Sequence, residues 1–293
     1  MKLYKTTITP TSNFATTLKG DTVFGHICWA IRFVFGKNRL EELLSKYENT
    51  PFLIVSDGFV EGYLPKPKIP SELLGEDSDK KKENRKKIWL TLEELISGDF
   101  TSAKKDEDVN ADKSISTIRN SINYKTFKTD DKNFTPYGES EFAIRKKDIY
   151  FLIDEDNFSL EELKQAFDLL SESGYGKDTT IGKGRFEFSD FIEVETKQSS
   201  KTFMTLSPFS PKGLVCEKIF YEPFTRFGKM GANRAFKNAF KKPILLADSA
   251  SVVHFEEKKS LQYIGKAIKN ISNAYKDVVH QGYSIVIPIK EIS

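Results

Sequence analysis

Cysteine and histidine are scarce in this chain of 293 residues, which contains two cysteines and three histidines. No C-x-x-C or H-E-x-x-H motif occurs, so the usual spacing of zinc ligands is missing. Two cysteines also cannot form the disulfide framework of a small secreted protein. We therefore predict no metal and no cofactor. The five side chains are Cys28, Cys216, His26, His254 and His280.

Long apolar runs are also missing. Even the segment 27–35 is interrupted by Arg32, and nothing approaches the roughly 18 apolar residues of a membrane span. The first residues, Met1–Thr6, lack the apolar segment of a secretory signal. From these absences and the few cysteines we expect a cytoplasmic protein with no membrane partner.

An excess of charge of one sign is absent as well, because 45 Lys and Arg face 42 Asp and Glu, a net charge of +3. Any basic, nucleic-acid-binding surface would therefore have to arise from local segregation of charge. Bulky apolar residues are plentiful, with 24 Phe and 11 Tyr. This length and content suit two domains, or one domain with a large insertion.

The pattern of the first two thirds predicts strands and helices in the order β-α-ββ-insertion-β-α-β. Without the insertion, this order is close to the ferredoxin-like β-α-β-β-α-β unit. Asp21 is placed as the N-cap of the first helix, and capping boxes begin at Thr91 and Ser159. The predicted elements are residues 2–9, 22–35, 52–55, 59–63, 115–127, 142–151, 160–173 and 185–194.

The sequence thus predicts an α+β protein with a first domain at 1–195, interrupted by an insertion at 65–145. The polar residues 196–201 then lead into a strand-rich second domain, 196–293. Residues 261–275 fit a helix and a strand equally well.

Residues 174–184 form the most distinctive local pattern, Gly-x-Gly-x5-Gly-x-Gly. It fits neither a P-loop nor a dinucleotide fingerprint, because the spacing is wrong and the segment follows a helix and opens a strand. Without Cβ atoms, Gly182 and Gly184 allow a sugar-phosphate chain to approach closely. An ordinary connection whose glycines serve turns is an equally good interpretation. The cations beside these glycines are Lys177, Lys183 and Arg185.

A second candidate is the segment 224–242, which contains cations and phenylalanines but no acidic residue. Cations neutralise phosphates and aromatic faces stack on bases, as in single-stranded RNA binding. We expect the aromatic side chains to face the core, and the cations to meet RNA or an acidic partner. The cations include Arg226, Lys229 and Arg234, and the aromatic residues are Phe224, Phe227, Phe236 and Phe240.

A third candidate lies at 117–126, where Arg119 and Lys125 suit phosphates, although a plain hairpin fits equally well. The side chains there that could bond to ribose or base edges are Asn120 and Asn123. Two aromatic residues near the tip of the following loop are costly to expose without a partner. They are Phe134 and Tyr137.

His26 could act as the base of a metal-independent ribonuclease by activating a ribose 2′-hydroxyl. Its neighbours in the predicted helix are nearly all apolar, including Val23, Phe24 and Ile27. A buried, hydrogen-bonded histidine is the favoured interpretation.

Four segments together resemble the RAMP superfamily, and within it the fourth subunit of the type III-A CRISPR (Csm) effector complex. The resemblance covers nearly the whole chain and is most specific in residues 1–195. The segments are LKGDTVFGHICWA at 18–30, YLPKP at 63–67, RNSIN at 119–123 and GKGRF at 182–186.

This resemblance implies two ferredoxin-like, RRM-related domains, the second one degenerate. It implies a non-catalytic RNA-binding scaffold that grips the 5′ repeat handle of CRISPR RNA and meets target RNA. The partners implied are the large polymerase/cyclase subunit and the backbone RAMP subunit. A thumb at about 114–145, with Phe134 and Tyr137, would wedge into the guide–target duplex. The implied RNA-binding residues are Lys177, Gly182, Lys183, Gly184, Arg185, Arg119, Asn120, Asn123, Lys125, Arg226, Lys229 and Arg234.

Two departures limit what the resemblance implies. The related backbone subunit cuts target RNA with a loop aspartate, whereas Asp21 stands at a helix start, so that activity is not transferred. The family pattern has Asp-Arg where this chain has Asn123-Tyr124, which leaves Lys125 as the neighbouring cation. The alternative to a scaffold is an endoribonuclease that cleaves CRISPR repeat RNA with His26 as its base.

Overall fold

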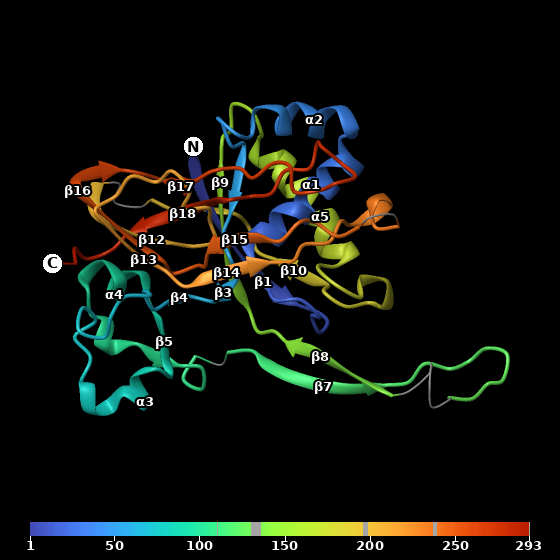
Figure 1. Cartoon of the computed structure of the whole chain (residues 1–293), viewed down its shortest axis with the longest axis horizontal. Coiled ribbons are helices and arrows are strands. Elements are labelled where there is room, and N and C mark those ends of the chain that lie inside the picture. The colour runs from blue at the N-terminus through green and yellow to red at the C-terminus, as the bar shows by residue number, and fades with distance from the viewer. Residues whose placement is uncertain (110, 130–135, 196–198, 237–238, 293) are drawn as a thin grey trace.

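The computed structural model describes residues 1–109, 111–129, 136–195, 199–236 and 239–292. The chain is a mixed α/β protein in which a body of sheets and helices carries one long hairpin that extends away from it (Figure 1). Within the described ranges, no helix has the length and apolar character needed to cross a membrane.

The first half is built on an antiparallel sheet with the strand order β10-β1-β9-β2. Helices connect β1 to β2 and β9 to β10, which gives the predicted β-α-β-β-α-β order once the insertion is removed. Two short strands extend this sheet, β3 beside β9 and β11 beside β1. The elements are β1 (Lys2–Pro10), α1 (Gly20–Val34), α2 (Lys37–Lys46), β2 (Leu53–Val55), β3 (Phe59–Val60), β9 (Lys147–Ile153), α5 (Leu160–Ser173), β10 (Phe186–Phe188) and β11 (Ile192–Glu193).

Local sequence signals explain where two of the described helices begin. The predicted capping boxes are confirmed, because Thr91 and Glu94 cap α4 (Leu92–Ser97) and Ser159 and Glu162 cap α5. The prediction that Asp21 is the N-cap of α1 is wrong. The cap position is Lys19, and Asp21 lies buried in the first helical turn, where its carboxylate binds another side chain.

Between β3 and β9 the chain forms two further units. The first is a three-stranded sheet, β4-β5-β6, with the short helices α3 and α4. The second is the long hairpin of β7 and β8, paired from Lys113↔Ala143 to Arg119↔Tyr137 (Figure 1). The bounds are β4 (Leu64–Pro65), α3 (Lys81–Asn84), β5 (Lys87–Leu90), β6 (Lys104–Lys105), β7 (Lys113–Arg119) and β8 (Tyr137–Ala143).

The second half contains a five-stranded sheet with the order β13-β16-β12-β18-β17, and a separate pair, β14 and β15. Of residues 261–275, Tyr263–Gly265 form β17. No α-helix follows α5 in the described ranges, so a second, degenerate ferredoxin-like domain stays a prediction. The remaining bounds are β12 (Ser199–Thr205), β13 (Lys218–Phe220), β14 (Pro223–Arg226), β15 (Ile244–Ala247), β16 (Val252–Ser260) and β18 (Tyr283–Pro288).

One large hydrophobic core joins the two halves. Buried Phe24 and Phe151 of the first half belong to the same cluster as Leu206, Val252 and Ile285 of the second. Such continuous burial makes the halves cooperate in folding. The predicted domain division at residue 195 stays a prediction.

Ion pairs at the start of α1 connect the halves as well. Arg226 of β14 binds both carboxylate oxygens of Asp21 at 2.6 Å, and His280 Nε2 lies 3.2 Å from Asp21 Oδ2. Burial alone would raise the pKa of Asp21, but the nearby His280 and Arg226 hold it well below its usual range. Gly20 is needed here because a Cβ would collide with the carbonyl oxygen of Val55.

We predict that Arg226→Met lowers the free energy of unfolding by roughly 3 kcal/mol, because it leaves the buried Asp21 carboxylate without its main partner. Urea denaturation at pH 7 measures this loss. Because the pKa of Asp21 is lowered by folding, its contribution is complete above the ordinary value near 4 and is lost below it. The difference in the free energy of unfolding between wild type and Arg226→Met therefore narrows below about pH 4.

The matched control is Arg185→Met, which removes an exposed guanidinium that makes no ion pair within the described ranges. Equal urea midpoints for the two variants would contradict a stabilising role of the Asp21–Arg226 pair.

Candidate nucleic-acid interface

The glycine loop, residues 174–184, folds tightly onto itself between α5 and β10. Its two ends are joined where Tyr175 N donates to Gly184 O at 2.9 Å, and Gly184 N donates to Asn13 O. All four glycines have positive φ. A Cβ at Gly184 would collide with the backbone of Tyr175, whereas a Cβ at Gly182 would meet nothing within 4 Å. Gly184 therefore closes the loop, and Gly182 is the glycine that faces open space.

Two glutamates of β8 fix this loop to the hairpin. Lys183 is buried, and its Nζ lies 2.7 Å from Glu141 Oε1. Arg119 of β7 reaches Glu139 at 2.8 Å and Glu141 at 3.1 Å, and Lys177 also pairs with Glu139. The three cations were predicted as site residues from the sequence, and the two glutamates were not.

The cluster is close to electrically neutral, since Asp178 joins the two glutamates opposite the three cations. Hydrogen bonds from Lys183, Asn13 and Arg119 lower the pKa of Glu141 to about 2, so it is ionised at neutral pH. The Lys183 ammonium faces carboxylates instead of solvent. Of the loop cations, Lys177 is 61% exposed and Arg185 is exposed.

Beyond the cluster, the hairpin carries exposed apolar side chains. Asn123 closes a tight turn, because its Oδ1 accepts a hydrogen bond from Lys125 N at 2.9 Å. Asn120 and Lys125 are exposed. Tyr137 is 48% exposed at the start of β8, whereas Phe134 lies outside the described residues. The other exposed apolar residues of the hairpin are Ile115, Ile118, Ile122, Tyr124 and Phe127.

The segment 224–242 differs from its prediction. The expectation that its aromatic residues face the core is wrong for three of the four, since Phe227, Phe236 and Phe240 are 75%, 92% and 76% exposed. Only Phe224 packs on a buried cluster. The physical reason is that the buried cluster under the β14–β15 hairpin is small, so this hairpin buries few of its side chains.

The cations of this segment fall into two groups. Arg226 is bound to Asp21, and Arg234 makes a bidentate pair with Asp277 at 2.6 and 3.2 Å. Lys229 is exposed, with its Nζ 5.8 Å from the centroid of the Phe240 ring. Lys229 therefore remains accessible, and the two arginines are held by carboxylates.

His26 stabilises the glycine loop from α1. Its Nε2 accepts a hydrogen bond from Gly176 N at 3.2 Å, and its ring lies 4.9 Å from that of Tyr175. Burial lowers the pKa of His26 to about 4, so the imidazole is neutral at pH 7. The lone pair that a general base would use is occupied by a backbone amide.

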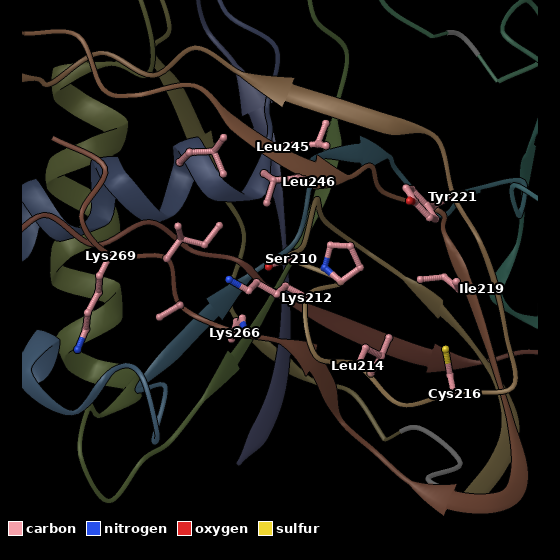
Figure 2. A pocket seen from close by; sticks show the side chains of 14 residues that line it. Ser210, Lys212, Leu214, Cys216, Ile219, Tyr221, Leu245, Leu246, Lys266 and Lys269 are labelled. Carbon is pink, nitrogen blue, oxygen red and sulfur yellow. The ribbon is translucent and has the colours of Figure 1, made fainter.

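A cavity of about 650 Å³ opens in the second half, away from these residues (Figure 2). Lys212, Lys266 and Lys269 lie toward one side of it, and Leu214 and Ile219 toward the other. None of the predicted site residues lines it. Within the described ranges, no group of three or more His, Cys, Asp or Glu side chains is arranged to hold a metal ion.

Comparison with solved structures finds the same fold over almost the entire chain. A chain of a crystal structure of a Csm1–Csm4 cassette in complex with cA4 superposes with a TM-score of 0.64, at 16% identity and with 98% of each chain covered. A chain of a Csm3–Csm4 subcomplex from the type III-A CRISPR–Cas interference complex superposes with a TM-score of 0.61, at 15% identity, covering 98% of this chain and 100% of that one.

Comparison with curated protein sequences finds no match. The family model of the RAMP superfamily matches residues 11–187, which include α1, β2, β9, the β7–β8 hairpin and the glycine loop. Because this match spans more than half of the sequence, the chain belongs to the RAMP superfamily.

Proposed function

We propose that this chain is a non-catalytic RNA-binding scaffold subunit of a type III-A CRISPR effector complex. In this role it grips the 5′ repeat handle of CRISPR RNA at the glycine loop. It inserts the tip of the β7–β8 hairpin at the guide–target duplex, and it docks the large polymerase/cyclase subunit and the backbone RAMP subunit. Membership of the RAMP superfamily and the fold shared with chains from Csm assemblies support this proposal.

The observation that carries the proposal is the joining of the glycine loop to the hairpin. The Lys183–Glu141 pair fixes the hairpin base against the loop, so the exposed cations of the loop lie at the base of a hairpin whose outer part carries exposed apolar side chains. A strand of RNA held by its phosphates at the loop is thereby led to the apolar hairpin.

Accessibility divides the predicted RNA-binding residues into two groups. Those with solvent-facing groups are proposed to touch RNA, through phosphates or through close approach of the backbone. Those that are buried or only partly exposed, and are held in ion pairs, tight turns or loop closure, are proposed to position the first group. The first group is Lys177, Gly182, Arg185, Asn120, Lys125 and Lys229, and the second is Lys183, Gly184, Arg119, Asn123, Arg226 and Arg234.

The hairpin is suited to the role of a thumb because it places aromatic and aliphatic side chains in solvent. Tyr124 is 89% exposed and Phe127 is 80% exposed, and the predicted contact residue Tyr137 is 48% exposed. Apolar groups inserted beside a base pair compensate for lost stacking. The contribution of Phe134 stays a prediction.

We expect Arg185→Gln to weaken binding of handle-bearing RNA. The slope of log K against the logarithm of the salt concentration should become shallower by about 0.7, the effect of one lost contact to a single-strand phosphate. Fluorescence anisotropy at several salt concentrations measures both quantities. Lys258→Gln is the control, since this exposed lysine lies on β16, on the opposite side of the molecule (Figure 1). An unchanged slope for Arg185→Gln would refute its phosphate contact.

A second prediction concerns the anchor of the hairpin. Glu141→Gln should speed hydrogen exchange of the β7 and β8 amides roughly 10- to 150-fold at pH 7, because losing a charged hydrogen bond costs about 1.5–3 kcal/mol. Since folding lowers the pKa of Glu141 from 4.5 to about 2, its stabilisation is complete above pH 4.5 and is lost as the pH falls toward 2. The difference in melting temperature between wild type and Glu141→Gln therefore narrows below pH 4.5.

Glu187→Gln serves as the matched variant for this experiment, because Glu187 is an exposed carboxylate on β10 that makes no ion pair in the part of the chain described. If both variants exchanged like wild type at the hairpin, the cluster would not be its anchor.

The proposal also predicts that purified protein leaves CRISPR repeat RNA uncut, with or without the substitution His26→Ala. The reason is the occupied lone pair of His26. Denaturing gels in the presence of a chelator test this. Cleavage by the wild type that disappears in His26→Ala would show that the protein is a ribonuclease and contradict the non-catalytic role.

A further inference from the structure

The β14–β15 hairpin continues beyond its paired strands as an extension, of which the described residues are 227–236 and 239–243. Backbone hydrogen bonds hold it together, from Met230 N to Ala239 O at 2.7 Å and from Lys241 N to Gly228 O at 2.8 Å. It presents Phe227, Phe236 and Phe240, the three phenylalanines that the structure leaves largely in solvent.

Packing within the chain does not account for this exposure. The same hairpin buries Met230, Ile244 and Leu246 in a small cluster with residues of the segment 268–278, and the three phenylalanines lie outside it. The bridge between Lys229 and Phe240 and the hydrogen bond from Lys241 N to Gly228 O place Phe227 and Phe240 on neighbouring strands of the extension. Exposed apolar side chains this near each other mark a surface that meets a partner.

The charges around the phenylalanines indicate what kind of partner fits. No acidic residue occurs between Glu222 and Asp248 in the sequence. Within the described ranges, the exposed Lys229 and Lys242 make no ion pair. Cations beside exposed aromatic faces form the combination that binds single-stranded nucleic acid, where phosphates meet the cations and bases stack on the rings.

The extension lies next to the glycine loop through their common support, α1. Gly176 of the loop binds His26, and a Cβ at Gly231 of the extension would lie 3.3 Å from the indole nitrogen of Trp29. His26 and Trp29 are three residues apart and share one face of the helix, about 4.5 Å apart along its axis. Figure 1 shows the orange extension and the yellow-green loop on the same side of the molecule.

We propose that Phe227, Phe236 and Phe240 form a stacking platform for unpaired bases of the RNA strand that crosses the glycine loop. This inference rests on the proposed RNA-binding function and adds a base-contacting surface to its phosphate contacts. The loop holds the backbone of the strand, and the extension receives its bases without selecting a sequence, because every base has a π-face.

The test measures the affinity of full-length protein for handle-bearing RNA after Phe236→Ala and Phe240→Ala. Each variant should bind roughly 10-fold more weakly, the usual effect of one lost base stack, with an unchanged salt slope because no phosphate contact is removed. Phe236→Trp should bind like wild type, and Phe236→Leu like the alanine variant. Both positions are exposed, so the fold should be unaffected, as circular dichroism can verify.

Two controls separate stacking from general apolar contact. Leu245→Ala removes a 69% exposed aliphatic side chain from the same hairpin and should leave the affinity unchanged. RNA with abasic sites in its unpaired segment should bind wild type and Phe236→Ala alike.

The outcomes are distinguishable. If wild type binds the RNA and the phenylalanine variants bind equally well, the platform is refuted and the RNA-binding function stands. If the variants keep RNA binding but lose another subunit of the complex in copurification, the surface docks protein and the inference is overturned. If wild type itself does not bind the RNA, the proposed function fails together with the platform.

Discussion

The contact between Lys183 and Glu141 is the constraint on which the proposed interface depends. A buried ammonium is stable only beside carboxylates, so Lys183 requires the glutamates of β8 to stay at the loop. This requirement joins a loop and a hairpin that are more than thirty residues apart in the chain. It also neutralises the charge that the sequence suggests for binding, which leaves Arg185 as the exposed cation at this end of the loop.

Helix α1 is the second organising element. Asp21 at its start binds Arg226, His26 one turn later supports Gly176, and Trp29 lies against the extension at Gly231. The helix therefore connects the second half, the glycine loop and the exposed phenylalanines. The Gly20-Asp21 pair makes this possible, since glycine lets the helix start approach β2 and the carboxylate reaches across to β14.

The elements that local rules control were predictable from sequence. Capping boxes at Thr91 and Ser159 fix two helix starts, and hydrophobic spacing identifies α1 and α5. Asp21 was misassigned because an aspartate at a helix start serves equally well as a cap or as a partner for a distant arginine. That arginine, Arg226, lies 205 residues away in the chain.

The candidate site was predictable only in part, for a related reason. Charge and glycine content single out the loop, but burial of Lys183 depends on the register of β8, which brings Glu139 and Glu141 to one face. The alternation of these glutamates was the available signal. The exposure of Phe236 contradicts the usual preference of phenylalanine for the core. Sequence alone does not show that the buried cluster under the β14–β15 hairpin is small.

The long hairpin has a consequence for how the chain can vary. Its base is tied down by the Phe14–Phe142 pairing and the glutamates, whereas between Asn120 and Lys128 the backbone hydrogen bonds are internal to the hairpin. Changes of length or sequence in that outer part leave the packed body untouched. The reach of the hairpin can therefore diverge between relatives without loss of folding.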